Sequence, residues 1–268
     1  MRTYDIKKPG GAYVSCGEVI PEKAEKIVIA VHGFTSSKES PTVQLLMKRL
    51  PEKGLGVVGI DLPGHGMGSS LREELRIGAC LESVSAAEEH IASRFPDAEI
   101  CYFASSFGAY ITGIRISTEP HRGRKAFFRS PAVNMPALFM RKDLTEEERA
   151  FFRELDEKGF AERSFDLGRP VRITRAFIDD LKSHDLFSLF DPEKYGPHSI
   201  AIARGEKDRV IDPAEAARFA AAFHIPETVL PGEGHSLSDR PETPLLVADL
   251  AASFFLEGQT VEPLNAKS

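Results

Sequence analysis

Apolar residues are grouped along the chain in two alternating patterns. Short runs rich in β-branched residues predict strands, and the segments between them, with apolar positions three or four apart, predict helices. The strand predicted at residues 26–31 is apolar at every position after Lys26, which is typical of a strand buried on both faces of a parallel sheet. Further strands are predicted at residues 3–7, 13–20, 56–61, 97–104, 125–130, 199–204 and 227–230. Helices are predicted at residues 41–50, 81–95, 106–117, 213–223 and 245–255.

This order of elements predicts the fold class. Strands that alternate with helices indicate an α/β fold with a mostly parallel central sheet and helices on both faces. The first two strands are separated by the turn signal Pro9-Gly10-Gly11 and are expected to lie antiparallel at one edge.

The alternation breaks over residues 131–197. This segment is rich in charge and phenylalanine, with helical patterns at 145–158, where Thr145 and Glu148 fit a capping box, and at 174–183. We interpret it as a lid inserted into a core made of residues 1–130 and 198–268. Its phenylalanines are expected mostly to form the lid's own core, with a minority facing a substrate pocket. They include Phe139, Phe151, Phe152, Phe160, Phe165, Phe177, Phe187 and Phe190.

One apolar run stops abruptly at a serine flanked by small residues. In this stretch, residues 101–110, Ala104 and Gly108 lie two positions either side of Ser106. A very tight strand-to-helix turn requires such small neighbours and exposes the side chain of its central residue above the sheet. Alanine replaces the glycine that is usual at the first position, and a serine before a helix can also be an ordinary N-cap. The motif therefore needs support from elsewhere in the chain.

Composition excludes several classes of function. The 268 residues carry a net charge of −6 with acidic and basic residues interspersed, so no basic stripe offers a surface to nucleic acid. Three widely spaced cysteines form neither a disulfide framework nor a zinc motif, and no other metal-ligand spacing is present. The sequence has no signal peptide and no run long enough to span a membrane, so we expect a cytoplasmic protein, either a monomer or a homodimer.

Two further residues can activate a serine. A serine hydroxyl is a poor nucleophile at neutral pH and needs a histidine to accept its proton and a carboxylate to orient that histidine. Ser106, Asp208 and His235 each follow a predicted strand, and the carboxyl ends of parallel strands meet at one edge of a sheet. Their chain order, with the serine first, is the order found in α/β-hydrolases.

Neighbouring residues offer alternatives to two members of this set. Ser105 could be the exposed hydroxyl, but phenylalanines lie two residues either side of it. Asp212 could be the acid, although it precedes Pro213 and fits a helix N-cap. His32 and His65 lie in turns and are expected to be scaffold residues, as is Asp61.

Four motifs together carry a family resemblance. They are His32-Gly33-Phe34, Asp61-Leu62-Pro63-Gly64-His65-Gly66, the serine turn, and Gly205-Glu206-Lys207-Asp208 paired with Gly234-His235. Along nearly its whole length the chain resembles lid-bearing serine esterases and lipases of the α/β-hydrolase superfamily. Within that group it is similar to bacterial cinnamoyl or feruloyl esterases and to monoglyceride-lipase-like proteins. The resemblance implies an α/β-hydrolase fold with Ser106 as nucleophile, Asp208 as acid and His235 as base, and no cofactor.

The same resemblance implies an oxyanion hole. Attack on an ester carbonyl creates an oxyanion, which two preorganised backbone N–H groups stabilise. The amides of Phe34 and Phe107 fit this role, since Phe107 follows the nucleophile at a helix N-terminus and Phe34 lies in the loop that supplies the second donor in this fold.

We therefore expect a carboxylic ester hydrolase that works through an acyl-enzyme on a small-molecule ester. The acyl group is expected to be small and aromatic, of the hydroxycinnamoyl type, or of short to medium chain length. One alternative is a serine aminopeptidase or amidase on the same scaffold. The other is a non-catalytic ligand-binding homologue, which would have no need for a general base beside an exposed serine.

Overall fold

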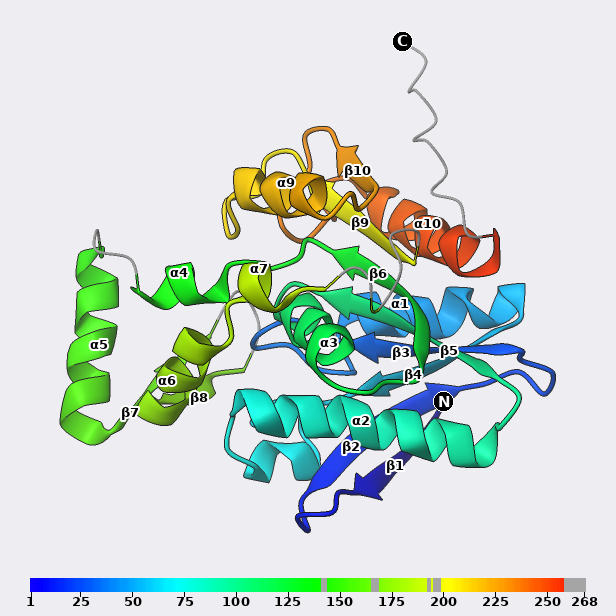
Figure 1. Ribbon diagram of the computed structural model, residues 1–268, viewed down its shortest axis with the longest axis horizontal. Helices are drawn as coiled ribbons and strands as arrows, with labels where there is room; N and C mark the ends of the chain where they lie inside the picture. The colour runs from blue at the N-terminus through cyan, green and yellow to red at the C-terminus, as the bar shows by residue number, and fades with distance from the viewer. Residues whose placement is uncertain (141–143, 165–168, 192–193, 195–198, 258–268) are drawn as a thin grey trace.

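A central eight-stranded sheet organises the computed structural model, which describes residues 1–140, 144–164, 169–191, 194 and 199–257 (Figure 1). Its strand order is β1-β2-β4-β3-β5-β6-β9-β10. The strands are β1 (Arg2–Lys7), β2 (Tyr13–Val19), β3 (Lys26–Val31), β4 (Leu55–Ile60), β5 (Glu99–Ser105), β6 (Gly123–Arg129), β9 (Ile200–Gly205) and β10 (Glu227–Leu230). β1 and β2 are antiparallel to their neighbours and all other pairs are parallel, which confirms the predicted sheet.

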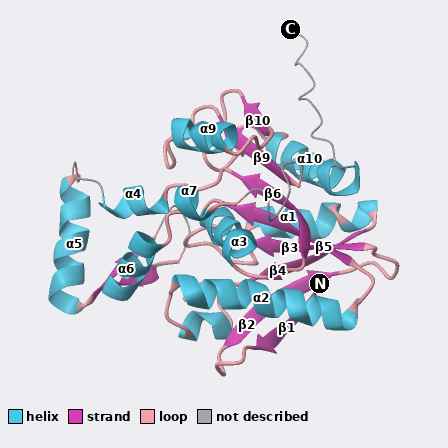
Figure 2. Cartoon of the chain, viewed as in Figure 1, coloured by secondary structure: helices cyan, strands magenta, loops and turns pink. Residues whose placement is uncertain are grey.

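Helices cover both faces of the sheet, also as predicted (Figure 2). Alternate residues of β3 explain why its sequence is apolar throughout, because Ile27 and Ile29 join one buried cluster while Val28 and Ala30 join the other. The first cluster is covered by α2 (Ile77–Arg94), α3 (Phe107–Thr118) and α9 (Pro213–Ala222). The second is covered by α1 (Pro41–Arg49) and α10 (Thr243–Glu257). Two short 3-10 helices, η1 (Pro51–Lys53) and η2 (Ser69–Arg72), lie in connections.

Between β6 and β9 the chain forms a group of short helices and strands, which lies to the left of α3 in Figure 1. They are α4 (Met135–Met140), α5 (Glu146–Lys158), β7 (Phe160–Arg163), β8 (Val171–Thr174), α6 (Arg175–Ser183) and α7 (Leu186–Leu189). The capping box of Thr145 and Glu148 is confirmed. The antiparallel pair β7–β8 was not expected from the sequence, because each strand is only four residues long and lies among charged residues.

One helix begins earlier than its sequence indicates. α2 starts at Ile77, not at residue 81, although its N-cap residue Arg76 has no side chain that can cap a helix. The carboxylate of Asp180, in α6, accepts a hydrogen bond from the Ile77 amide at 3.0 Å and pairs with Arg76. The cap comes from a residue about a hundred positions away, which local sequence patterns do not reveal.

Candidate active site

Ser106 lies in the tight turn between β5 and α3 and has a strained backbone. Its φ of 51° and ψ of −115° fall outside the regions that serine normally occupies. The turn is held by a hydrogen bond from the Ser106 amide to the Arg129 carbonyl of β6, at 2.9 Å. A methyl group at Gly108 would lie 2.5 Å from the His32 carbonyl oxygen, so the predicted need for a small residue at this position is met by close backbone packing.

Asp208, His235 and Ser106 form a continuous chain of hydrogen bonds. His235 Nε2 lies 3.0 Å from Ser106 Oγ, and His235 Nδ1 lies 2.7 Å from Asp208 Oδ2. Burial favours a raised pKa for the Asp208 carboxyl, but its hydrogen bond and charge interaction with His235 and two backbone amides hold that pKa below its ordinary value. The carboxylate thus stays ionised and fixes the imidazole with Nδ1 as donor and Nε2 as acceptor toward the serine.

The loop that carries His235 is fixed by side chains from the end of β6. Ser130 Oγ donates to the His235 carbonyl at 2.8 Å, and the Arg129 guanidinium donates to the Ser236 carbonyl. Sequence reasoning missed Arg129, because an arginine at the end of a strand is usually solvated and gives no signal of a site.

Ser105 and Asp212, the alternative candidates for the nucleophile and the acid, have other roles in the structure. Ser105 is the last residue of β5 and is buried. Asp212 caps α9 by accepting a hydrogen bond from the Ala214 amide, as its sequence position suggested. Neither residue takes part in the hydrogen-bond chain of Ser106 and His235.

His32 and His65 stabilise the loops after β3 and β4. His32 Nε2 accepts from the Leu62 amide at 3.0 Å, while Nδ1 donates to the Gly33 carbonyl at 2.7 Å. His65 Nδ1 donates to the Pro63 carbonyl at 2.8 Å. Burial lowers the pKa of His32 to about 4 and that of His65 to about 3, so both rings are neutral near pH 7.

A buried ion pair joins the same two loops. Asp61, which is fully buried, accepts hydrogen bonds from both the backbone amide and the ammonium group of Lys38, each at 2.7 Å. Phe34 lies within the loop that ends at Lys38. The position of its backbone therefore depends on the Lys38–Asp61 pair.

Phe34 and Phe107 flank Ser106 from two different elements. Phe107 is the first residue of α3, where the partial positive charge of the helix N-terminus lies. The two rings meet edge to face with centroids 5.4 Å apart, and both contact Phe177 of α6. Residues of the inserted segment therefore pack directly over the carboxyl ends of β3 and β5.

A cavity of about 1160 Å³ opens above Ser106 and His235. Apolar residues from the loops and from α4, including Phe34, Met135, Leu138 and Phe139, form part of its wall. Of the inserted phenylalanines that the structure describes, Phe139 lines this cavity. Phe151, Phe177 and Phe190 belong to the buried cluster, and Phe152 and Phe187 pack against it. Phe165 lies outside the described residues.

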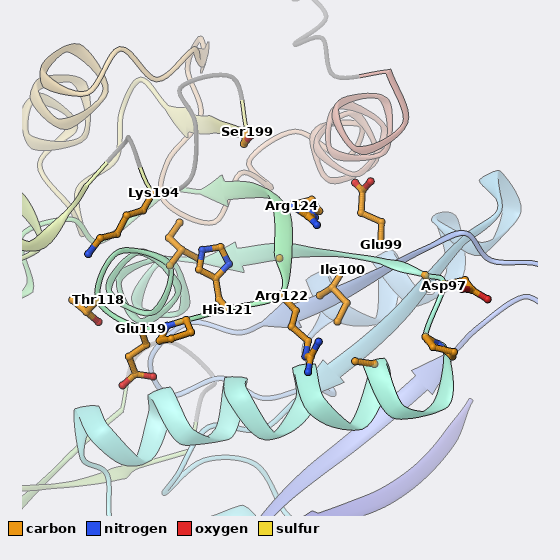
Figure 3. Close-up of a pocket in the computed structure, with 16 residues that line it drawn as sticks. Asp97, Glu99, Ile100, Thr118, Glu119, His121, Arg122, Arg124, Lys194 and Ser199 are labelled. Carbon is orange, nitrogen blue, oxygen red and sulfur yellow. The ribbon is translucent and has the colours of Figure 1, made fainter.

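A second cavity, of about 1010 Å³, lies at the opposite edge of the sheet (Figure 3). Its wall includes Glu99 and Ile100 at the start of β5, Arg124 near the start of β6 and Thr118 at the end of α3. Because parallel strands end at the other edge, this cavity is separate from Ser106. Over the described ranges, no group of three or more His, Cys, Asp or Glu side chains could hold a metal ion, and no helix has the length and apolar character needed to cross a membrane.

Comparison with known proteins places the chain in a family. The model of the alpha/beta hydrolase family matches residues 28–250. A structure from Agrobacterium vitis is 22% identical, with a TM-score of 0.74 over 94% of this chain and 98% of that one. Est1E from Butyrivibrio proteoclasticus, solved with ferulic acid bound, is 18% identical, with a TM-score of 0.75 over 95% and 98%. An esterase domain from Rhodothermus marinus is 17% identical, with a TM-score of 0.67 over 94% and 97%. No curated protein matches the sequence. The family model spans most of the chain, so the chain belongs to the alpha/beta hydrolase family.

Proposed function

We propose that the protein is a serine hydrolase that cleaves carboxylic esters through an acyl-enzyme on Ser106. The observation that carries this proposal is the hydrogen-bond chain from Asp208 through His235 to Ser106, whose side chain lines a cavity. A protein that only bound a ligand would have no use for an imidazole held between a carboxylate and a serine in a strained turn.

The geometry allows a two-step reaction. Ser106 Oγ attacks the ester carbonyl while His235 Nε2 takes its proton, and the proton then passes to the departing alcohol as the C–O bond breaks. His235 next removes a proton from water, which attacks the acyl-enzyme and releases the carboxylic acid and free Ser106. Asp208 stabilises the imidazolium in each step. We assign the amides of Phe34 and Phe107 to the oxyanion, each worth a few kcal/mol of barrier at most.

We further propose that residues 131–197 act as a lid and that the substrate is a small ester. The contacts of Phe177 with Phe34 and Phe107 support the lid, because they place α6 over the carbonyl-binding loops. Aromatic rings near Ser106 suit a small aromatic or a short to medium acyl group. The structural likeness to Est1E, which binds ferulic acid, agrees with an aromatic group.

Covalent labelling tests the proposal. A fluorophosphonate probe is expected to label the wild-type protein and Ser105→Ala, but not Ser106→Ala or His235→Gln at the same protein concentration. p-Nitrophenyl acetate should give a burst of p-nitrophenol equal to the amount of labelled serine. No labelling of the folded wild-type protein would contradict a hydrolase and favour a ligand-binding role. Faster turnover of peptide anilides than of matched esters would favour the amidase alternative.

A further inference from the structure

The cavity above Ser106 has a charge opposite to that of the whole protein. The chain carries a net charge of −6, yet four arginines line this cavity: Arg129, Arg163, Arg169 and Arg209. Arg129 is the last residue of β6 and Arg163 is the last residue of β7. Arg169 lies just before β8, and Arg209 directly follows Asp208. The lining also contains two glutamates, Glu39 and Glu148. Glu39 pairs with Lys38, and Glu148 completes the capping box of α5.

These arginines differ from most others in the molecule. Arginines elsewhere mostly pair with a carboxylate, as do Arg76 with Asp180 and Arg204 with Glu227. In the part of the chain that the structure describes, none of the four cavity arginines forms such an ion pair. Arg163 lies over the ring of Phe151, at 4.5 Å from its centroid. Among the described residues, the four guanidinium groups of the cavity therefore have no direct ion pair, although the charge of Asp208 acts on Arg129.

Arg129 is the most informative of the four, because it is only 9% exposed. Its guanidinium donates one hydrogen bond, to the Ser236 carbonyl, and its other N–H groups have no acceptor among the described residues. Burial lowers its pKa to about 10, against the opposing influence of Asp208, but the group stays charged at neutral pH. A buried cation that forms no direct ion pair is costly to the fold even with the charge of Asp208 nearby, so its retention beside the His235 loop calls for a function.

We infer that the ester cleaved at Ser106 carries a second, negatively charged oxyanion group, a carboxylate or a phosphate, which the cavity arginines bind. Guanidinium groups pair with both kinds of oxyanion through parallel hydrogen bonds, which fits this chemistry better than a neutral acyl chain does. The inference rests on the proposed function, since it concerns the substrate of the same site.

Matched substrate pairs test the charge preference on each side of the ester bond. On the alcohol side, 4-acetoxybenzoate and 4-acetoxyphenyl phosphate are compared with the neutral methyl 4-acetoxybenzoate. On the acyl side, monoethyl suberate is compared with ethyl octanoate. Each kcat/KM is divided by the rate constant for alkaline hydrolysis of the same ester. We expect at least one anionic substrate to exceed its neutral partner by about tenfold or more. The benzoate and phosphate results decide between the two oxyanions, and equal values in every pair would overturn the inference.

Variants then identify the binding groups. Arg209→Gln and Arg129→Gln should each lower the ratio of anionic to neutral kcat/KM about tenfold. Arg124→Gln removes the same charge at the opposite edge of the sheet, where Figure 3 shows its side chain, and should leave the ratio unchanged. If Arg129 only positions the His235 loop, its variant would lower kcat for both substrates equally and leave the ratio as in wild type, which counts against the inference. Arg209, in an exposed position, keeps the test valid should Arg129→Gln not fold.

Fluorophosphonate labelling separates the two proposals. If the protein labels at Ser106 and hydrolyses neutral and anionic esters with equal kcat/KM, the proposed function stands and the inference of an anionic substrate is contradicted. If the folded protein does not label, the proposed function itself is contradicted.

Discussion

Ser106 takes a backbone conformation that serine adopts only where its neighbours enforce it. The enforcing contact is the approach of α3 to the end of β3. Gly108 has no room for a side chain there, because the carbonyl oxygens of Val31 and His32 lie within about 2.5 Å of the position that a Cβ would take. The strain at Ser106 is thus stored by the packing of a helix on the central strand, and the serine side chain is presented to the cavity as a result.

Alanine scanning of two helical glycines tests this packing. Gly108→Ala should lower the free energy of unfolding by about 1–3 kcal/mol, because the gain in helix propensity of about 1 kcal/mol is smaller than the cost of moving backbone atoms of a central strand. Gly78→Ala, in α2, meets no atom within 4 Å and should stabilise the protein by about 0.5–1 kcal/mol. Urea unfolding measures both variants. Equal effects of the two substitutions would contradict the proposed crowding at Gly108.

The buried histidines should make stability depend on pH. The pKa of His32 is lowered to about 4 and that of His65 to about 3, whereas an unfolded histidine titrates near 6.5. Between these values the unfolded chain binds more protons than the native one, so the free energy of unfolding falls as pH decreases from 6.5, by about 1.4 kcal/mol per pH unit for each histidine. Above pH 7 these two groups contribute no pH dependence.

His65→Gln isolates one of the two contributions. Glutamine keeps a hydrogen-bond donor for the Pro63 carbonyl but does not titrate, so the slope of stability between pH 6 and pH 4.5 should decrease by about 1.4 kcal/mol per unit. Urea unfolding at several pH values gives this slope. An unchanged slope would mean that His65 is protonated in the folded protein.

At the scale of elements, the loops after β3 and β4 are held together by the Lys38–Asp61 pair. Asp61→Ala would leave Lys38, which is 4% exposed, with Glu39 as its remaining partner, and should cost about 3–5 kcal/mol of stability. Because the loop carries Phe34, we also expect kcat to fall more than KM rises. Glu89→Ala breaks the exposed pair with Arg122 and should change stability little, which makes it the matched control. Similar losses in the two variants would argue against a special role of the buried pair.

Helices and strands whose own residues carry an apolar or capping pattern could be predicted from the sequence. The strands of the parallel sheet are apolar on both faces, and helices α1 and α9 have N-caps followed by proline, so their sequences carry the signal. The start of α2 was missed because Asp180 supplies its cap from α6, and β7–β8 was missed because four-residue strands carry little pattern. The convergence of Ser106, Asp208 and His235 could be expected because each follows a strand, and their catalytic roles stay a prediction. Arg129 could not be predicted, since its importance depends on which side chains surround it.

In the whole molecule, an acidic protein surrounds a cavity whose arginines form no direct ion pair with any described residue. The net negative charge opposes the long-range approach of an anionic substrate, while the cavity attracts it at short range. Arg169 and Arg209 are exposed at the cavity and their charges are screened by salt, whereas Arg129 is buried and screened much less.

This difference predicts a two-part response to ionic strength. The Debye length shrinks from about 10 Å at 0.1 M salt to about 3 Å at 1 M, so the exposed arginines lose most of their influence over that range. If the cavity binds an oxyanion, its preference for the anionic ester over its neutral partner should fall several-fold between 0.02 M and 1 M NaCl and then level off above one. In Arg129→Gln the preference should disappear at 1 M, because the group that salt screens least is gone. Measurement of both kcat/KM values across the salt series provides the test, and a wild-type preference that vanishes at 1 M would show that the buried guanidinium does not contact the substrate.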